Sequence, residues 1–370
     1  MLPTTRKMVR SPANGCLAVL FVWSAGSVQA DDAAGGQPAE QLALRPYVEH
    51  EGQVQPAAGR GRPAATLAID PAAVMQAAYT DTDAAEVATR EEVESADQPE
   101  ILWPGFLYGL SGFEDFAHPV SSPIYNHDPF IDTRLNVLYV WHKFPDGCDI
   151  KGGDLQVWAL QLYVALTERL QLTATCDGYS RLRARALQPD EGWNDLMAGL
   201  KYNLLADVDR QFLLSTGLSW RLSNGHARTL HGGVDELNPY VTAAKGFGKC
   251  HVIGTVGGRL AMDHNMGNHI LYESLHIDYE LFENFYPLIE FNGLQYLRNA
   301  DRLPLGVGGL DYANIGSNDV RGNSTFWGEV GFRWKVVDHL ELGATYGFPM
   351  MDPDNDIFDH RVTVSVIVGL

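Results

Sequence analysis

The chain lacks the features that mark helical membrane proteins and most nucleotide- or metal-dependent enzymes. Beyond the N-terminal segment, no stretch approaches the roughly 18 consecutive apolar residues that a membrane helix needs. There is no glycine-rich phosphate loop, no zinc-ligand spacing and no basic patch, and we expect no cofactor. The formal net charge of −19 argues against nucleic acid as a partner.

Cysteine is scarce, with four residues in the whole chain. Three remain if the N-terminal segment that holds Cys16 is removed, which is an odd number for an oxidising compartment. Their spacing does not match a metal site. Cys148 and Cys176 are expected towards the outer ends of neighbouring strands, which makes them a candidate disulfide, whereas Cys250 falls in a tight turn without a candidate partner.

The N-terminus has the three regions of a secretory signal. Arg6, Lys7 and Arg10 precede the apolar run CLAVLFVW, and small residues follow up to Ala30. We therefore expect residues 1–30 to be a signal peptide; Cys16 precedes the apolar run, which disfavours a lipoprotein signal. Residues 31–100 carry fourteen acidic residues against four arginines, a net charge of −10, and predict a disordered periplasmic tether.

The last ten residues alternate strictly between two kinds of side chain. Val362, Val364, Val366, Val368 and Leu370 share one face, while Arg361, Thr363 and Ser365 share the other. This is the lipid-facing and lumen-facing alternation of a transmembrane β-barrel. From about residue 132 onward we count about twelve such segments, each near the ~9–11 residues that a tilted membrane strand needs. The fold class is thus all-β, an antiparallel up-and-down barrel over residues 132–370.

The connections between these segments alternate between short and long. Five are short, at residues 167–169, 206–209, 248–249, 283–284 and 337–339, and most of those between them are much longer. Bacterial outer-membrane barrels have short periplasmic turns and long outer loops, with both termini in the periplasm. We therefore expect the cell outer membrane as the location, with membrane lipid and, through the C-terminal strand, the barrel-assembly machinery as partners.

Residues 101–131, just before the first strand, are too apolar for a linker and too rich in Pro and Gly for a regular element. Two placements of this pre-barrel segment fit equally well. It either enters or caps the barrel lumen, or it packs along the barrel base.

Several segments, in order, carry a family resemblance. They are GGDLQVWALQLYVALTERLQLTATCDGY, GWNDLMAGLKYNLL, STGLSWRLSNG with LNPYVTAAKGFG, and VVDHLELGATYGF with the closing strand. From about Pro123 to Leu370 the chain resembles an outer-membrane family named for the MetA pathway of phenol degradation, whose members are described as transporters. It departs from that family in its terminal Leu, where an aromatic residue is usual, and in SNG, where Pro-Thr-Gly is common. The resemblance implies passage of small, aromatic or apolar molecules, and it brings no catalytic residues.

Two weaker candidate sites lie near the expected outer rim. Ser223 is a possible nucleophile of a barrel lipid hydrolase, but those enzymes place a His two residues earlier, where this chain has Arg221. His226 and His231 would have to reach back from a loop. Asp352, Asp354 and Asp356 have the alternating spacing of a calcium loop without its glycine, so we expect a solvated acidic loop rather than a metal site.

Strand parity predicts a charged lumen. The expected lining residues are Arg134, Lys201, Arg221, Lys245, Arg259, Asp278, Glu280, Glu290, Glu329, Arg333, Lys335 and Arg361. A barrel of about twelve strands lies between filled barrels and open pores, so an open pathway and a salt-bridged interior stay equally favoured. We predict a passive channel for a small-molecule solute and not an enzyme; the alternatives are a lipid-modifying barrel enzyme that uses Ser223 and a structural or adhesive barrel.

Overall fold

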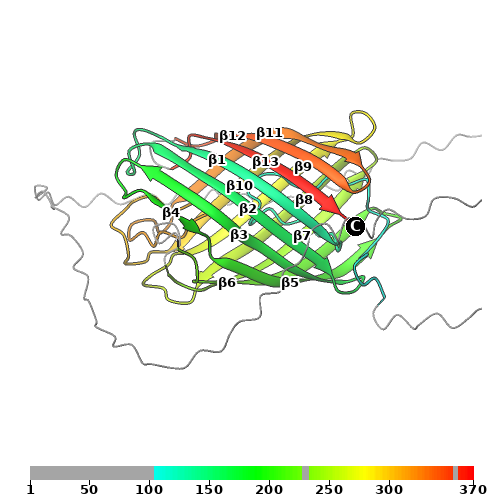
Figure 1. Ribbon diagram of the computed structural model, residues 1–370, viewed down its shortest axis with the longest axis horizontal. Coiled ribbons are helices and arrows are strands. Elements are labelled where there is room, and N and C mark those ends of the chain that lie inside the picture. The colour runs from blue at the N-terminus through cyan, green and yellow to red at the C-terminus, as the bar shows by residue number, and fades with distance from the viewer. Residues whose placement is uncertain (1–103, 227–232, 353–356) are drawn as a thin grey trace, which may run out of the picture. The chain divides into compact units, whose positions relative to one another are not determined.

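The computed structural model describes residues 104–226, 233–352 and 357–370 (Figure 1). The expected signal peptide, the expected tether and residues 101–103 lie outside the described residues. Within the described ranges, no helix is long and apolar enough to cross a membrane.

The described chain forms one closed antiparallel sheet (Figure 1). Its strands follow one another around the ring in chain order, and the last strand pairs with the first to close it. The strands are β1 Arg134–Phe144, β2 Gly153–Ala165, β3 Leu170–Ala184, β4 Asp190–Trp193, β5 Leu196–Asp207, β6 Phe212–Leu222, β7 Glu236–Phe247, β8 Cys250–Ala261, β9 His269–Tyr279, β10 Phe285–Arg298, β11 Ser324–Val337, β12 Leu340–Pro349 and β13 His360–Gly369. Because β4 and β5 pair with successive parts of β3, they form one wall strand, and the predicted twelve-stranded barrel is confirmed.

The wall is polar inside and apolar outside. In β13 the side chains of Arg361, Thr363 and Ser365 are buried, whereas Val364 and Val368 are exposed. Successive side chains of a strand point to opposite faces, so one alternation sets both surfaces along each strand. Leucine, valine and tryptophan dominate the exposed face, as expected for contact with lipid.

The connections divide the barrel into two ends. The short turns lie at one end together with the start of β1 and the C-terminus, where the Leu370 N–H donates to the Thr133 carbonyl at 3.1 Å. The long connections lie at the opposite end, among them residues 299–323 between β10 and β11. These are called the short-turn end and the long-loop end below, and the predicted alternation of connections is present (Figure 1).

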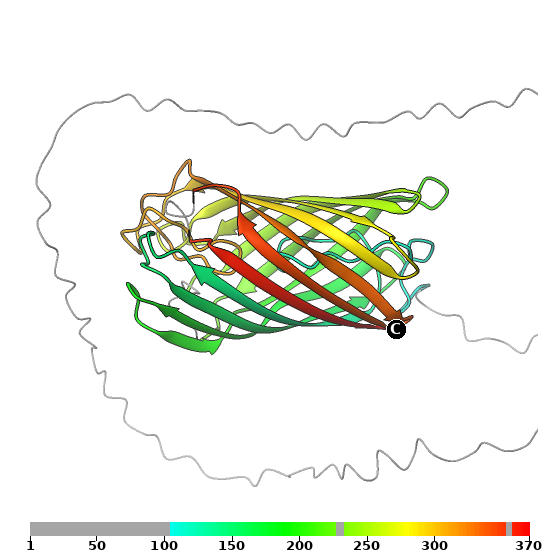
Figure 2. The ribbon, with the colours of Figure 1, turned by 90° about the horizontal axis from the view of Figure 1, so that it is seen from above.

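Residues 112–130 run inside the barrel, and in Figure 2 their cyan trace is visible among the strands towards the short-turn end. This stretch, the plug segment, receives hydrogen bonds from strands on different sides of the ring, including β2, β5, β7, β10 and β11. Only a segment within the lumen can reach all of them. Of the two placements open for the pre-barrel segment, residues 112–130 show entry into the lumen, whereas Pro104 and Leu107 hydrogen-bond to the end of β2 and the turn between β2 and β3, at the barrel base.

Candidate functional site in the barrel lumen

A single wall carboxylate holds the middle of the plug segment. Glu290 in β10 accepts hydrogen bonds from the backbone N–H groups of Val120 at 2.9 Å and Ser121 at 2.6 Å. It also lies 2.6 Å from Nδ1 of His276, and the Asn292 amide donates to the Ser121 hydroxyl at 2.8 Å. Hydrogen bonds to a buried charged acceptor are stronger than neutral ones, so Glu290 is the main anchor of this part of the plug segment.

His276 links Glu290 to a second carboxylate, that of Asp278 in β9. Nε2 of His276 lies 2.9 Å from one Asp278 oxygen, and Nδ1 of His251 lies 2.8 Å from the other. An ionised carboxylate only accepts hydrogen bonds. If both carboxylates are ionised, His276 must donate from both ring nitrogens and is then an imidazolium.

Wall cations bind the backbone carbonyls of the plug segment near the short-turn end. The guanidinium of Arg333 donates to the carbonyls of His118 at 3.1 Å and Pro119 at 2.7 Å. The ammonium of Lys335 donates to the Phe116 carbonyl at 2.8 Å and to that of Glu114. Near the short-turn end the wall therefore supplies donors and the plug segment supplies acceptors, the reverse of the arrangement at Glu290.

The end of the plug segment is held by a ring contact and an ion cluster. The His127 ring stacks on the Tyr240 ring with centroids 3.7 Å apart and 12° between the planes. The Asp128 carboxylate accepts hydrogen bonds from Lys201 at 3.0 Å and Arg134 at 2.6 Å. All five of these residues except Tyr240 carry or can carry a charge, and all are buried.

At the long-loop end, the connection of residues 299–323 folds into the barrel. Its Asp311 makes a two-pronged ion pair with Arg361, at 2.8 and 2.7 Å. Arg259 donates to the carbonyls of Leu310 at 3.3 Å and Ala313 at 3.0 Å while its Nε contacts Glu236 at 2.7 Å. The lumen is thus filled from both ends, by the plug segment and by this loop.

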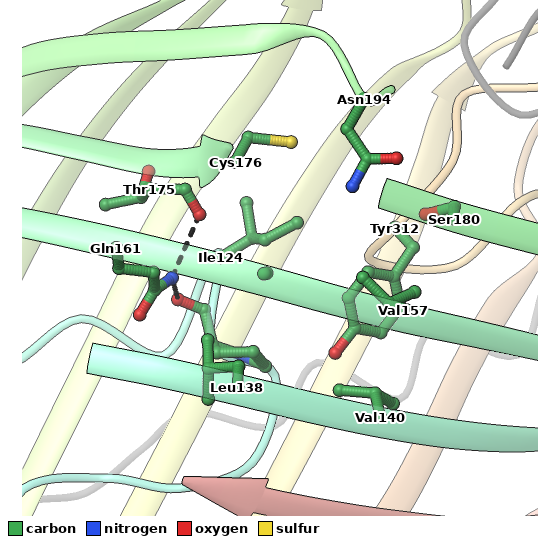
Figure 3. Close-up of a pocket in the computed structure, with 12 residues that line it drawn as sticks. Ile124, Leu138, Val140, Val157, Gln161, Thr175, Cys176, Ser180, Asn194 and Tyr312 are labelled. Atoms are coloured by element: carbon green, nitrogen blue, oxygen red, sulfur yellow. Dashed lines mark hydrogen bonds between the residues drawn. The ribbon is translucent and has the colours of Figure 1, made fainter. Parts of the chain in front are cut away.

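An apolar wall patch lies where the two fillings meet (Figure 3). The cavity there has a volume of about 10 Å³, which is room for about one water molecule. Its lining includes Leu138, Val140 and Val157 from the wall, Ile124 from the plug segment and Tyr312 from the loop. Figure 3 also shows the Gln161 amide, which donates to the Pro123 carbonyl at 2.7 Å and the Thr175 carbonyl at 2.9 Å.

A larger cavity, of about 390 Å³, opens at the short-turn end. It lies between the plug segment and the turn that joins β11 to β12, and Phe113, His118, Glu341 and Leu370 are among its lining residues. The interior therefore has a wide vestibule at the short-turn end and a tightly filled middle.

The charged residues predicted to line the lumen are mostly inside the barrel. The structure buries the side chains of Arg134, Lys201, Arg221, Arg259, Asp278, Glu290, Glu329, Arg333 and Arg361. Lys335 is partly buried and contacts the plug segment, and Glu280 lies at the rim beside Lys249 at 3.3 Å.

Lys245 differs from the prediction. The inward positions of β7 near its end are Ala244 and Gly246, which contact the apolar cluster around Phe116. Alternation then places Lys245 on the outer face, where its ammonium contacts the carbonyl of Arg210 at the short-turn end. A long cationic side chain on the lipid face reaches the polar rim in this way.

The structure does not form the candidate disulfide between Cys148 and Cys176. Cys176 lies in the middle of β3 rather than at its outer end, 3.3 Å from the guanidinium of Arg221. Cys148 lies in the connection between β1 and β2, where its thiol contacts the Pro145 carbonyl. Burial raises the pKa of the Cys148 thiol and keeps it protonated.

Ser223 lies at the exposed long-loop end. Its hydroxyl and backbone N–H both donate to the Asp235 carboxylate at 2.8 Å, and these hydrogen bonds lower the pKa of Asp235. His231, Asp354 and Asp356 lie outside the described residues, and Asp352 is exposed.

Sequence reasoning missed the residues that fill the lumen. Asp128 and Asp311 neutralise wall cations, yet both lie in segments without a strand period, so parity says nothing about them. Tyr240 was missed because a tyrosine in a strand has no charge pattern to mark it. A useful signal was the excess of cations over carboxylates among the predicted lining residues, which requires carboxylates from elsewhere.

No family model matches this chain, and no curated protein matches it. Among solved structures, an outer membrane channel from Pseudomonas putida F1 superposes with a TM-score of 0.51 at 13% identity, over 69% of this chain and 100% of that one. The NanC porin has a TM-score of 0.41 at 7% identity, over 64% and 100%. The translocator domain of the autotransporter NalP from Neisseria meningitidis has 0.40 at 10% identity, over 64% and 87%. The superposition on the Pseudomonas putida F1 protein shows that the chain has the fold of an outer-membrane β-barrel.

Proposed function

We propose that this protein is a gated channel for small solutes in an outer membrane, with residues 112–130 as the gate. The observation that carries the proposal is the kind of contact that holds the plug segment. No strand pairing joins it to the sheet among the described residues, and its contacts with the wall are made by side chains, as hydrogen bonds, ion pairs, ring stacking and apolar packing. It can therefore leave the lumen without opening the barrel.

The wall that withdrawal would uncover suits a water-filled path. Thr242, Thr255, Ser215 and Asn203 lie on it beside the charged residues, and all are buried only because the lumen is filled. A purely structural or adhesive barrel has no need of such a lining, since apolar side chains fill a closed interior at lower free-energy cost than buried ion pairs.

The proposal includes the expectations for the rest of the chain. The N-terminal residues would act as a signal peptide and a periplasmic tether, and the long loops would face the cell exterior. The resemblance to the phenol degradation family supports aromatic or apolar solutes, and so does the apolar patch of Leu138, Val140 and Val157.

Deletion of Ser111–Phe130 tests the gate directly. The Leu110 N–H donates to the Ile131 carbonyl at 2.8 Å, so the deletion joins two positions that are already adjacent. We expect steady single-channel conductance in planar bilayers from the deletion variant and rare openings from the full chain. A folded deletion variant, identified by its heat-dependent shift in gel mobility, that inserts and stays silent would contradict the plug segment as the gate.

A further inference from the structure

The plug segment places a ring and a carboxylate side by side on the lumen wall. His127 and Asp128 are consecutive residues, and both are buried. The ring lies flat on Tyr240, and the carboxylate accepts hydrogen bonds from Lys201 and Arg134. Together they have the outline of a small planar aromatic carboxylate.

The wall groups that receive this pair belong to the barrel and stay when the plug segment leaves. Lys201 lies on β5 and Tyr240 on β7, while Arg134 begins β1. Arg134 is also over the ring of Tyr163 in β2, 3.9 Å from its centroid, and keeps an ion pair with Asp132. Lys201, in contrast, has Asp128 as its only ion-pair partner among the described residues.

The ring platform is built into the wall. Gly217 on the neighbouring strand β6 lies directly under Tyr240, and a Cβ at this glycine would be 2.2 Å from Cζ of the ring. The absence of a side chain lets the Tyr240 ring lie flat along the wall, which presents its face to the lumen. A flat aromatic face binds another planar ring by offset stacking.

Two hydroxyl groups complete the site beside the platform. Thr242 and Thr255 both donate to the His127 carbonyl, at 2.7 and 2.6 Å. With the plug segment withdrawn, the Lys201 ammonium and the Thr242 hydroxyl lose their acceptors, while the Thr255 hydroxyl can donate to Thr242 Oγ1, 3.1 Å away. Buried donors that lose their acceptors favour a ligand that supplies new ones, above all an anion.

We infer that Tyr240, Lys201 and Arg134 form a binding site for a small aromatic carboxylate, which His127 and Asp128 imitate in the closed state. The inference rests on the proposed channel function and narrows its solute class from aromatic or apolar molecules to aromatic anions. The solute and the tip of the plug segment then compete for the same wall groups, so binding of solute and withdrawal of the plug segment favour each other.

Isothermal titration calorimetry of the full chain in detergent tests the site with three probes. Benzoate has ring and charge, cyclohexanecarboxylate has the charge alone, and benzyl alcohol has the ring alone. The double variant His127→Ala/Asp128→Ala removes the ring and the carboxylate that occupy the site in the closed state. We expect this variant to bind benzoate about tenfold or more tightly than the wild-type chain, because one charged hydrogen bond contributes that much to affinity. Asp115→Ala, at an exposed position of the plug segment, is the matched control and leaves benzoate affinity at the wild-type level.

Two further substitutions in the double variant separate the ring site from the charge site. Lys201→Gln should weaken benzoate by about tenfold and leave benzyl alcohol unchanged. Tyr240→Leu should remove the preference for benzoate over cyclohexanecarboxylate, expected at about three- to tenfold from ring stacking. If the double variant does not fold, Asp128→Asn serves in its place, because it keeps the shape and removes the charge.

Equal affinity for all three probes, or no binding by a folded variant, would overturn the inferred site. This result is distinguishable from failure of the channel. The Ser111–Phe130 deletion reports chloride conductance whether or not benzoate binds, so a conducting deletion variant without benzoate affinity refutes the site and leaves the channel. A silent deletion variant refutes the plug segment as the gate, and with it the proposed function on which the site rests.

Discussion

At the scale of single residues, Glu290 makes more contacts with the plug segment than its position on the inner face of β10 would predict. Its two oxygens receive two backbone N–H groups of the plug segment and one histidine nitrogen. A carboxylate is needed because an amide can accept on one side only. Glu290 therefore binds the backbone of Val120 and Ser121 and not their side chains. It fixes the position of the plug segment, and other amino acids at these two positions could make the same hydrogen bonds.

Glu290→Gln should release the plug segment while the barrel stays folded. The amide replaces one acceptor by a donor, so a backbone N–H is left facing an NH₂ group, at a loss of roughly 2 kcal/mol. Single-channel recordings should then show the open state more than about tenfold more often than in the wild-type chain. Glu280→Gln, at the rim beside Lys249, is the matched control and should leave the recordings unchanged. If Glu290→Gln opened no more often than the wild-type chain, Glu290 would not be the main anchor of the plug segment.

Lys245 lies on the outer face of β7, although the sequence predicted it in the lumen. Charge and approximate strand position predicted it in the lumen, but one step of register decides the face of every residue in a strand. The register of β7 is set by its pairing with β6 and β8, in which Leu213 lies opposite Ala244. That pairing depends on the folded neighbours and is not written in the strand itself.

At the scale of elements, the sequence predicted the strands but not the two segments that fill the lumen, residues 112–130 and 299–323. A strand of a membrane barrel must alternate because one face meets lipid, so segments such as the one ending in Val368 can be recognised alone. The plug segment and the loop of residues 299–323 have no period, since each residue takes whatever direction its wall partner requires. The sequence could show that they were unusual, but only the structure shows their path.

The closing strand β13 offers a test at this scale. It pairs with β1 over ten positions and with β12 over eight, so deletion of His360–Leu370 leaves two unpaired edges within the membrane. Unpaired backbone groups in lipid cost several kcal/mol each, and we expect no assembled barrel from the deletion variant. Leu370→Phe is the matched change and should fold and insert at least as well as the wild-type chain.

Gel mobility with and without heating, on outer-membrane fractions, measures both variants. A stably assembled barrel without β13 would contradict the closed topology, and failure of Leu370→Phe would contradict the view that the C-terminal residue accepts an aromatic side chain. Both outcomes are independent of any solute.

At the scale of the whole molecule, the barrel and the plug segment behave as wall and movable filling. The charge balance of the lumen depends on this division, because Asp128 and Asp311 belong to the filling and their partners Lys201 and Arg361 to the wall. Withdrawal of either filling leaves the wall more positive. The open lumen should therefore prefer anions, as long as the fillings leave together with their carboxylates.

A covalent lock between wall and filling tests this movement. Nδ2 of Asn292 lies 2.8 Å from Oγ of Ser121, so Ser121→Cys/Asn292→Cys places two thiols on facing side chains, where an oxidant can join them. In the Glu290→Gln background, oxidation should abolish the openings and dithiothreitol should restore them. Ser121→Cys alone controls for effects of oxidation on Cys148, Cys176 and Cys250. Openings that persist after mass spectrometry has confirmed the disulfide would show that solute passes without movement of the plug segment.

The position of the plug segment in the chain has a consequence for the order of assembly. The segment is made before β1, yet its anchors Glu290 and Arg333 come about 170 and 215 residues later. It cannot dock until those strands exist. The closing pair of β1 and β13 joins residues that lie still further apart in the chain, such as Arg134 and Gly369. The plug segment is thus expected to stay undocked until the last strands are made, and the lumen to be sealed only at the end of folding.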